Sequence, residues 1–362
     1  MGQVRHLGRR VVRRRTSHGR LFGLALVVVA ALAATAAPVL APHASNRQFP
    51  GLLNAPPTWP HIVDDRGAWR APFIYRWRLV NQLEQRYDED RSASLPLIWF
   101  KGGTLVQSSD EVVAPLLLLG ADSFGRDVFS RLLFGARISL GLAIVASLGA
   151  LLIGGAMGGA AGYVGGYLDD GLMRASDFVM VLPAMYVALA LRSVLPLVLT
   201  SAVVFTLLAS IFAVVGAPFI ARGVRAIVRS ERRLDYASAA QALGASDLRL
   251  LLRHLLPAAR GFVAVEITML VPAFIVAEAT LSYVGLGFPD PVASWGTMLH
   301  DAANVTVFAD FPWLLSPAAA MFLVVLGLNL ILQDGTPIKG VARSGAGVRD
   351  QAASRLGYER PM

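Results

Sequence analysis

Cysteine is absent from the 362-residue sequence, and lysine occurs only as Lys101 and Lys339. The absence of cysteine excludes disulfides and thiolate-bound metal sites. Each lysine is followed by glycine, so neither matches the G-K-[ST] ending of the phosphate-binding loop of ATPases. The six histidines are scattered and include no H-E-x-x-H pair, which argues against a zinc protease. We therefore expect this chain to have no metal site, no catalytic centre and no ATPase motif.

Charge is also scarce, because 16% of the residues are charged and 55% are hydrophobic, with a mean hydropathy of +0.56. A helix of about 20 apolar residues crosses the hydrocarbon of a bilayer. Backbone groups in lipid must be satisfied within the segment, so each crossing should be a helix. We predict an all-α integral membrane protein with six transmembrane helices. They lie in the stretches 21–46, 138–168, 178–191, 193–221, 261–287 and 311–333.

Arginine is concentrated at the N-terminus, where the first 20 residues hold seven arginines and no acid. Basic flanks stay in the cytoplasm, so we expect a cytoplasmic N-terminus and, after six spans, a cytoplasmic C-terminus. The loop 222–260, with eight arginines, then also lies in the cytoplasm. A cleaved signal peptide is the alternative interpretation of residues 21–37. We favour a retained anchor, because this run exceeds the ~7 to 15 apolar residues of a signal core.

Composition divides the chain into five regions. They are a cytoplasmic arginine-rich arm (1–20), a transmembrane anchor (21–41), an extracytoplasmic insert (42–118), a membrane core of five spans (120–336) and a cytoplasmic tail (337–362). The insert is rich in proline and mixed in charge. We predict that it forms a small ordered cap with one short helix around residues 76–91.

The second predicted span carries a small residue every four positions, at Gly154, Gly158, Gly162 and Gly166. This spacing places the glycines on one helix face and predicts close packing against another helix. Any tightly packed membrane bundle can show such a stripe. The pattern therefore predicts architecture rather than a particular solute.

Glu278 is an ionisable residue well inside the predicted fifth span. Such a group is costly in lipid and usually faces the bundle interior or a water-filled path. It is a candidate pathway residue, but we favour a structural carboxylate that is hydrogen-bonded between helices. Glu266 points about 120° away from it and needs no shared role. Arg192, near the outer end of the third span, is expected to reach the headgroups, and Pro272 is expected to kink the fifth.

The loop between the fourth and fifth spans has the pattern of a helix, a turn and a second helix. Asp235 and Gly244 can cap the two ends of the first helix, and Ser246 and Pro257 can mark the ends of the second. The first helix is short and built of small residues, so its backbone could approach a partner closely. An amphipathic hairpin that merely links two spans is the equally open alternative.

This loop resembles the signature of the transmembrane subunits of ABC importers, which is E-A-A, three residues, G, nine residues and I-x-L-P. The residues that match in register are Ala239, Ala240, Gly244, Leu256 and Pro257. Ser238 replaces the signature Glu, which puts any salt bridge from that position in doubt. His254 replaces the Ile and is similar to the dipeptide and oligopeptide branch of the family.

Two further motifs resemble the same branch. The segment before the second span has the pattern G-T-D-x-x-G-R-D with alanine in place of threonine, and its matching residues are Gly120, Asp122, Gly125, Arg126 and Asp127. Residues 278–287, followed by Ser294, Trp295 and Gly296, resemble the segment that ends the fifth span and follows it. The three motifs cover about 60% of the chain.

The resemblance implies a type I importer fold and a permease subunit that moves peptides or peptide-like solutes across a bacterial inner membrane. It further implies a homologous second permease subunit, two ATPase subunits and an extracytoplasmic binding protein. ATP and magnesium would be used by the ATPases, with no cofactor on this chain and no nucleic acid as partner. The ATPase-coupling loop would include Asp235, Tyr236, Ala239, Ala240, Gly244, His254, Leu256 and Pro257. A membrane sensor or scaffold and a secondary transporter are the alternatives, and no residue selects among dipeptides, longer peptides and metal chelates.

Overall fold

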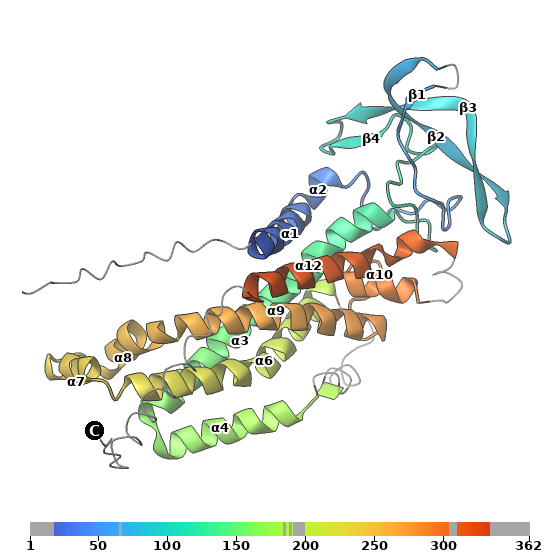
Figure 1. The fold of residues 1–362 in the computed structure, drawn as a ribbon. Coiled ribbons are helices and arrows are strands. Elements are labelled where there is room, and N and C mark those ends of the chain that lie inside the picture. Colours follow the sequence, from blue (N-terminus) through green and yellow to red (C-terminus); the bar gives the residue numbers. More distant parts are fainter. Residues whose placement is uncertain are drawn as a thin grey trace, which may run out of the picture.

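Figure 1 shows the computed structural model of the chain, which describes residues 18–64, 67–183, 186–187, 190, 200–303 and 310–333. The helices are α1 (His18–Thr35), α2 (Ala37–Leu40), α3 (Val128–Val164), α4 (Gly166–Val181), α6 (Ser201–Glu231), α7 (Asp235–Ala242), α8 (Asp247–Leu250), α9 (Arg260–Tyr283), α10 (Trp295–Asp301) and α12 (Ser316–Gln333). The strands are β1 (His61–Val63), β2 (Trp69–Asn81), β3 (Arg86–Trp99) and β4 (Val106–Ser108).

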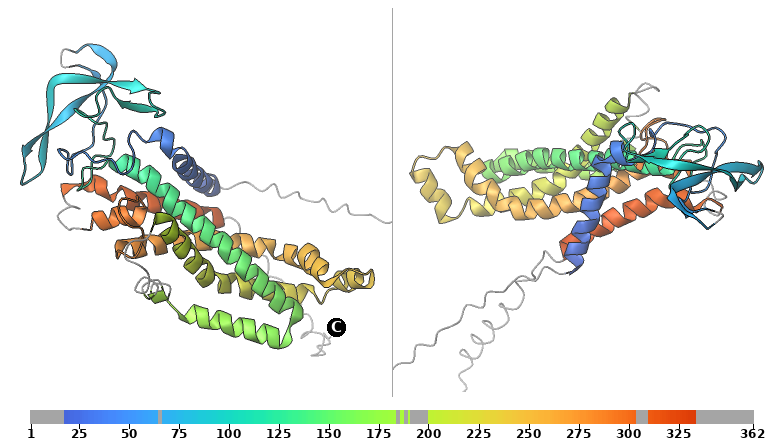
Figure 2. Two further views of the ribbon diagram at one scale, coloured as in Figure 1. Left: turned by 180° about the vertical axis from the view of Figure 1, so that it is seen from behind. Right: turned by 90° about the horizontal axis from the view of Figure 1, so that it is seen from above.

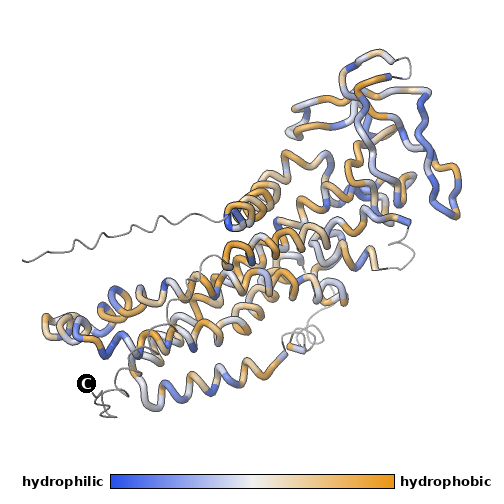
Figure 3. Tube along the Cα trace, in the orientation of Figure 1, coloured by the Kyte–Doolittle hydropathy of each residue, from blue (hydrophilic) through white to orange (hydrophobic). Residues whose placement is uncertain are grey.

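Within the described residues, 5 helical segments are long and apolar enough to cross a membrane. They are His18–Thr35, Val128–Val164, Ser201–Glu231, Asp247–Tyr283 and Pro312–Leu332. Each coincides with a predicted span, and Figure 3 shows apolar residues along most of their length. The remaining predicted span, 178–191, begins in α4 and lies largely outside the described residues, as does Arg192.

The long helices α3, α6 and α9 lie side by side and form the centre of the bundle (Figures 1 and 2). α1 crosses the bundle beside α12, as the view from above in Figure 2 shows. The β-sheet lies at one end of the bundle and α7 at the other (Figure 1). The arrangement agrees with the expectation that the insert and the loop 222–260 face opposite sides of a membrane.

The predicted glycine stripe packs α3 against α6. Cβ atoms built on Gly154, Gly158 and Gly162 would clash with backbone atoms of α6. Gly166 does not belong to the stripe, because α3 ends at Val164 and Gly166 begins α4 with open space around it. The prediction of close packing is therefore confirmed for three of the four positions.

The predicted helix at 76–91 is wrong, because this segment forms most of a β-hairpin. The four strands make an antiparallel sheet in the order β1-β2-β3-β4, and Arg76 to Asn81 pair with Arg86 to Asp90. Aromatic and β-branched residues favour a pleated surface, and the buried β2 residues Phe73, Ile74 and Tyr75 supply the apolar contact that holds the strand. The apolar residues of 76–91 are also spaced as in a helix, but the buried part of β2 just before them extends as a strand into this segment.

Pro257 does not end a helix, contrary to expectation. It lies in a 3-10 turn, Leu256–Ala259, which follows a π-helical turn, Leu251–Leu255, and leads directly into α9. Proline suits the first positions of a helical turn, where its missing N–H is not needed. The chain from Asp247 to Tyr283 is consequently one continuous helical rod, which also runs through Pro272.

Candidate functional site

The loop between α6 and α9 folds as a helical hairpin. α7 starts at Asp235, and Leu234 occupies the cap position without a side-chain capping bond, so the predicted Asp235 cap is wrong. Asp235 instead lies in the first turn, where its carboxylate faces the positive end of the helix dipole. Gly244 has a φ of 86° and open space around it, so the predicted left-handed end of the helix is confirmed. Ser246 precedes α8 as predicted, but its side chain makes no capping bond.

The predicted loop residues divide into an exposed and a half-buried group. Asp235, Tyr236, Ala239, Gly244, His254 and Pro257 are exposed, whereas Ala240 and Leu256 are half-buried against the main core. Ala237, which the signature does not single out, is the buried residue of α7. One face of α7 therefore rests on the bundle while the other, with its small side chains, remains open to a partner.

Tyr163, near the end of α3, ties the hairpin to the bundle. Its hydroxyl donates a hydrogen bond to the Asp247 carboxylate and accepts one from the Gln241 amide, with a distance of 3.4 Å for the latter. The Arg232 guanidinium lies over the Tyr163 ring, 4.5 Å from its centroid, and donates to the Tyr163 carbonyl. One side chain thus joins α3 to the end of α6, to α7 and to α8. Sequence analysis missed Tyr163, whose only signal is an aromatic residue directly after the glycine stripe.

Two other polar contacts support the same end of the molecule. The Tyr236 hydroxyl donates to the Glu231 carboxylate at 2.7 Å. Partial loss of water around this hydroxyl, together with the hydrogen bond, raises the pKa of Tyr236 to about 12. Arg225 of α6 pairs with the Asp169 carboxylate of α4, with 2.6 Å between Nη2 and Oδ2. α4 and α7 are therefore both attached to the same end of α6. This is the end that the arginine pattern predicts to be cytoplasmic.

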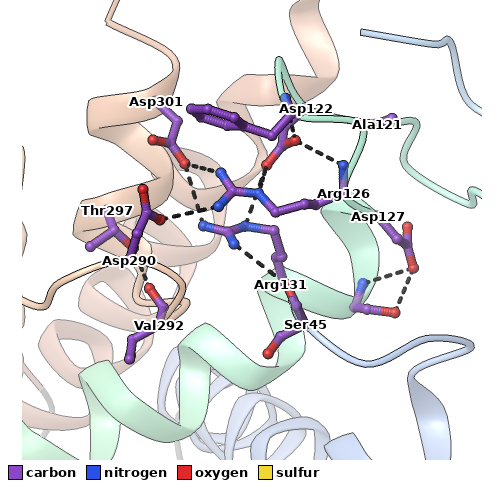
Figure 4. A network of polar contacts seen from close by, with 12 residues as sticks. Ser45, Ala121, Asp122, Arg126, Asp127, Arg131, Asp290, Val292, Thr297 and Asp301 are labelled. Atoms are coloured by element: carbon purple, nitrogen blue, oxygen red, sulfur yellow. Dashed lines mark hydrogen bonds and ion pairs between the residues drawn. The ribbon is translucent and has the colours of Figure 1, made fainter. Parts of the chain in front are cut away.

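A buried ion network occupies the opposite end (Figure 4). The Arg126 guanidinium donates to Asp122 at 2.7 Å, to Asp290 at 3.1 Å and to Asp301 at 2.6 Å. Arg131 shares Asp301 at 3.3 Å, and both arginine side chains are almost fully buried. Burial opposes the charge of Arg126, but the attraction of Asp122 and Asp301 outweighs it and raises the pKa of this guanidinium. The network joins the start of α3 to α10 and to the segment before α10.

The other residues of the G-T-D-x-x-G-R-D motif, which precedes α3, shape the chain around this network. Gly120 and Gly125 have φ angles of 73° and 71°, and a Cβ on either would collide with backbone atoms of residues 49 or 55. Asp127 caps α3 by accepting hydrogen bonds from the N–H groups of Phe129 and Ser130. The structure therefore brings together all five matching residues of the motif, whereas the partner Asp301 was missed because it lies far away in the sequence.

Glu278 lies at the centre of a second buried polar cluster. This cluster includes residues of the motif that ends the fifth predicted span. Its carboxylate accepts hydrogen bonds from the hydroxyls of Ser139 at 2.7 Å and Ser282 at 2.8 Å. Ser139 in turn accepts from the N–H of Trp295 at 3.1 Å. Ser294 caps α10 in a capping box with Thr297. The arrangement fits the favoured interpretation of Glu278 as a carboxylate hydrogen-bonded between helices.

Close contacts complete this cluster around α10. The Trp295 indole N–H donates to the Leu132 carbonyl at 3.1 Å, which fixes α10 against α3. A Cβ built on Gly296 would lie 2.6 Å from the Ser282 Cβ, so only glycine permits this approach to α9. Across the described residues, no group of three or more His, Asp or Glu side chains is arranged to hold a metal ion. The chemistry offered by these sites is packing and ion pairing.

Comparison with known proteins gives consistent matches. Residues 150–333 match the family described as "Binding-protein-dependent transport system inner membrane component". The oligopeptide transport system permease protein OppC of Bacillus subtilis is 38% identical over 213 residues, which are 59% of this chain and 67% of that protein. The glutathione transport system permease protein GsiD of Pectobacterium atrosepticum is 36% identical over 217 residues, or 60% and 69% of the two chains.

Two further comparisons concern another relative and a solved structure. A putative peptide transport system permease protein of Brucella suis biovar 1 is 35% identical over 243 residues, covering 67% of this chain and 75% of the relative. Among solved structures, a chain of the MetNI methionine ABC transporter in inward-facing conformations is 19% identical, with a TM-score of 0.42, and is matched over 96% of its length and 57% of this chain. A likeness of that degree does not by itself define the fold.

Proposed function

We propose, from the premise that this chain belongs to the family of binding-protein-dependent transport system inner membrane components, that it is a permease subunit of an ATP-driven importer of peptides or peptide-like solutes. Membership in this family makes the chain a multi-pass membrane protein of the type I importer fold and implies association with ATPase and binding-protein partners. The peptide cargo is proposed because the relatives at 35% and 38% identity carry the words peptide or oligopeptide in their names.

The observation that carries the proposal is the position of the hairpin α7–α8. It lies at the end of the bundle opposite the β-sheet (Figure 1), and it is tied through Tyr163 to both α3 and α6. A partner that pushes or pulls α7 would therefore act directly on two membrane-spanning helices. Movement of rigid helices around a central path is the usual basis of alternating access.

The proposed assembly contains this chain, a homologous second permease subunit, two ATPase subunits and an extracytoplasmic solute-binding protein. It resides in a bacterial inner membrane, with the N-terminus, the C-terminus and α7 in the cytoplasm. The ATPases bind and hydrolyse magnesium-ATP, and this chain binds no cofactor. Asp235, Tyr236, Ala239, Ala240, Gly244, His254, Leu256 and Pro257 are proposed as the loop that receives the movement. Glu278 is proposed as a structural residue rather than a contact for the solute.

The test uses the transporter reconstituted in liposomes with its binding protein. Ala239 is exposed on α7, so Ala239→Trp should leave the fold intact but prevent close approach of an ATPase cleft. We expect ATP-driven uptake of a peptide mixture to be lost while membrane insertion is unchanged. Ala93→Trp, at an exposed position of β3, is the matched control and should transport normally. Normal uptake by Ala239→Trp would contradict the coupling role, and uptake driven by an ion gradient without ATP would contradict the importer class.

A further inference from the structure

The turn between β3 and β4 exposes aromatic side chains that the sheet could have buried. Trp99 is 52% exposed and Phe100 is 77% exposed, although Leu97 and Ile74 form a small core with Leu116 directly beside them. The exposure is not a consequence of a loose turn. The Phe100 N–H donates to the Leu105 carbonyl at 3.0 Å, and the Thr104 N–H donates to the Lys101 carbonyl at 3.2 Å.

The turn is fixed at the level where the first membrane helix ends. The Leu105 N–H donates to the carbonyl of Val39, in α2, at 2.6 Å. In Figure 1 the β3–β4 end of the sheet lies directly above α2, whereas the β2–β3 turn points away from it. α2 follows α1 after a single residue, so the turn lies next to the outer end of the membrane-spanning segment.

An exposed apolar surface continues from α1 to this turn. Phe22, Val29 and Leu32 of α1 are exposed along the length of the proposed span, and Val39 of α2 is half exposed beside the turn. Apolar side chains exposed on a span face lipid wherever no neighbouring subunit covers them. Trp99 and Phe100 belong to the turn that is bonded to Val39, so they place two more exposed apolar side chains near the end of the helix.

Lys101 adds a charge to this aromatic pair. It is exposed, and in the part of the chain that the structure describes no acidic side chain pairs with it. Its carbonyl accepts hydrogen bonds from the N–H and the hydroxyl of Thr104, which holds the backbone of Lys101 in the turn next to Phe100. Tryptophan and other aromatic side chains are enriched at the level of lipid headgroups, and lysine reaches the phosphates from the same level.

From this geometry we propose that Trp99, Phe100 and Lys101 form an interfacial anchor, which holds the extracytoplasmic sheet against the outer leaflet of the membrane. The two rings lie among the headgroups and upper acyl chains, and the Lys101 ammonium contacts lipid phosphate. The anchor fixes the sheet relative to α1 independently of the transported solute. It depends on the membrane location of α1 but not on the proposed cargo or the coupling role of α7.

The absence of cysteine makes this proposal directly testable on the full chain. Phe100→Cys and, separately, Trp99→Cys are labelled with a nitroxide and placed in nanodiscs of phosphatidylethanolamine and phosphatidylglycerol. We expect both labels to be more accessible to oxygen, which concentrates in lipid, than to a water-soluble nickel chelate. Leu83→Cys is the matched control, because Leu83 is 97% exposed in the β2–β3 turn. Its label should show the reverse preference.

Two results would overturn the anchor. Nickel accessibility at positions 99 and 100 equal to that at position 83 would place the turn in water. Exclusion of both reagents would mean that another protein covers it. A further measurement concerns the charge: Lys101→Glu should lower the oxygen accessibility of the label at position 99, and the shift should be larger in nanodiscs that contain phosphatidylglycerol than in neutral ones. An unchanged label would remove Lys101 from the anchor.

Discussion

Gly162 of α3 packs against Arg225 of α6 so closely that a Cβ on the glycine would lie 2.7 Å from the arginine's carbonyl oxygen. Gly158 meets Ala221 in the same way about one turn earlier, and Gly154 meets Ala217 about two turns earlier. Backbone contact at three positions over about two helical turns leaves no room for a side chain on the α3 face. The α3 side of this seam therefore tolerates little substitution.

Gly158→Leu should therefore separate α3 from α6. Overpacking of a well-packed interior costs about 1 to 3 kcal/mol for added methylenes, and a rigid backbone neighbour places this position at the upper end of that range. We expect a lower melting temperature in detergent and reduced uptake in liposomes. Gly155→Leu, one residue from the seam and with only distant neighbours, is the control and should melt close to the parent protein. Equal melting temperatures for the two variants would argue against a tight seam.

Arg126→Gln should destabilise the outer end of the bundle strongly. Removing one partner from a buried ion network leaves uncompensated charges and costs about 3 to 5 kcal/mol. Asp290 would lose its guanidinium partner, and Asp122 and Asp301 would be left to share Arg131 alone.

The matched comparison for Arg126 is Arg76→Gln, which breaks the pair between Arg76 and Asp90 on the exposed hairpin. Exposed ion pairs contribute little to stability because water and salt screen them, so this variant should unfold at nearly the same denaturant concentration as the parent. A similar shift of the unfolding denaturant concentration in both variants would contradict a stabilising role of the buried network.

Two substitutions of Glu278 can distinguish a structural role of this residue from a role in the solute pathway. Glu278→Gln retains the shape and can still bond Ser139 and Ser282, so we expect uptake near that of the parent and a stability change of about 1 kcal/mol or less. Glu278→Ala leaves a cavity and unpaired hydroxyls, and should cost about 2 to 5 kcal/mol. Loss of uptake in a stable Glu278→Gln variant would instead assign the carboxylate to the pathway.

Tyr163→Phe tests the connection between the bundle and the hairpin. The change removes the hydroxyl bonds to Asp247 and Gln241 but keeps the ring under Arg232. A lost hydrogen bond of this kind costs about 1 kcal/mol, and we expect faster amide hydrogen exchange within residues 235–250. Tyr167→Phe, at a side chain that is 98% exposed, should leave exchange there unchanged. Identical exchange in the two variants would place the connection elsewhere.

The membrane core could be predicted from the sequence because its signals are local. Long uncharged runs, the four-residue spacing of glycines and a glycine at a left-handed position each depend on neighbours within one helix. The five apolar segments, the α3–α6 seam and the turn at Gly244 are confirmed for that reason. The sixth span rests on residues outside the described part of the chain and stays a prediction.

The failures involve contacts between residues that are distant in sequence. The helix expected at 76–91 is a hairpin because the segment continues strand β2, in which Phe73, Ile74 and Tyr75 are all buried. Asp301 reaches Arg126 across 175 residues, and no local pattern marks either as the partner of the other. Tyr163 acquires its importance only when the ends of α3, α6 and α7 meet. The motifs identified the right segments. Which residues those segments contact could be seen only in the structure.

The backbone seam between α3 and α6 has a mechanical consequence. At these glycines the backbones of the two helices are in contact, so sliding or separate rotation would bring atoms into collision. We therefore expect α3 and α6 to tilt together as one rigid unit. α3 alone has 37 residues, which corresponds to about 55 Å of helix. If such a rod tilts about a point near Tyr163, the largest displacement falls at its other end, where Arg126 and Arg131 contact α10. A tilt of the rod would connect the two faces of the protein without a relay of side-chain rearrangements.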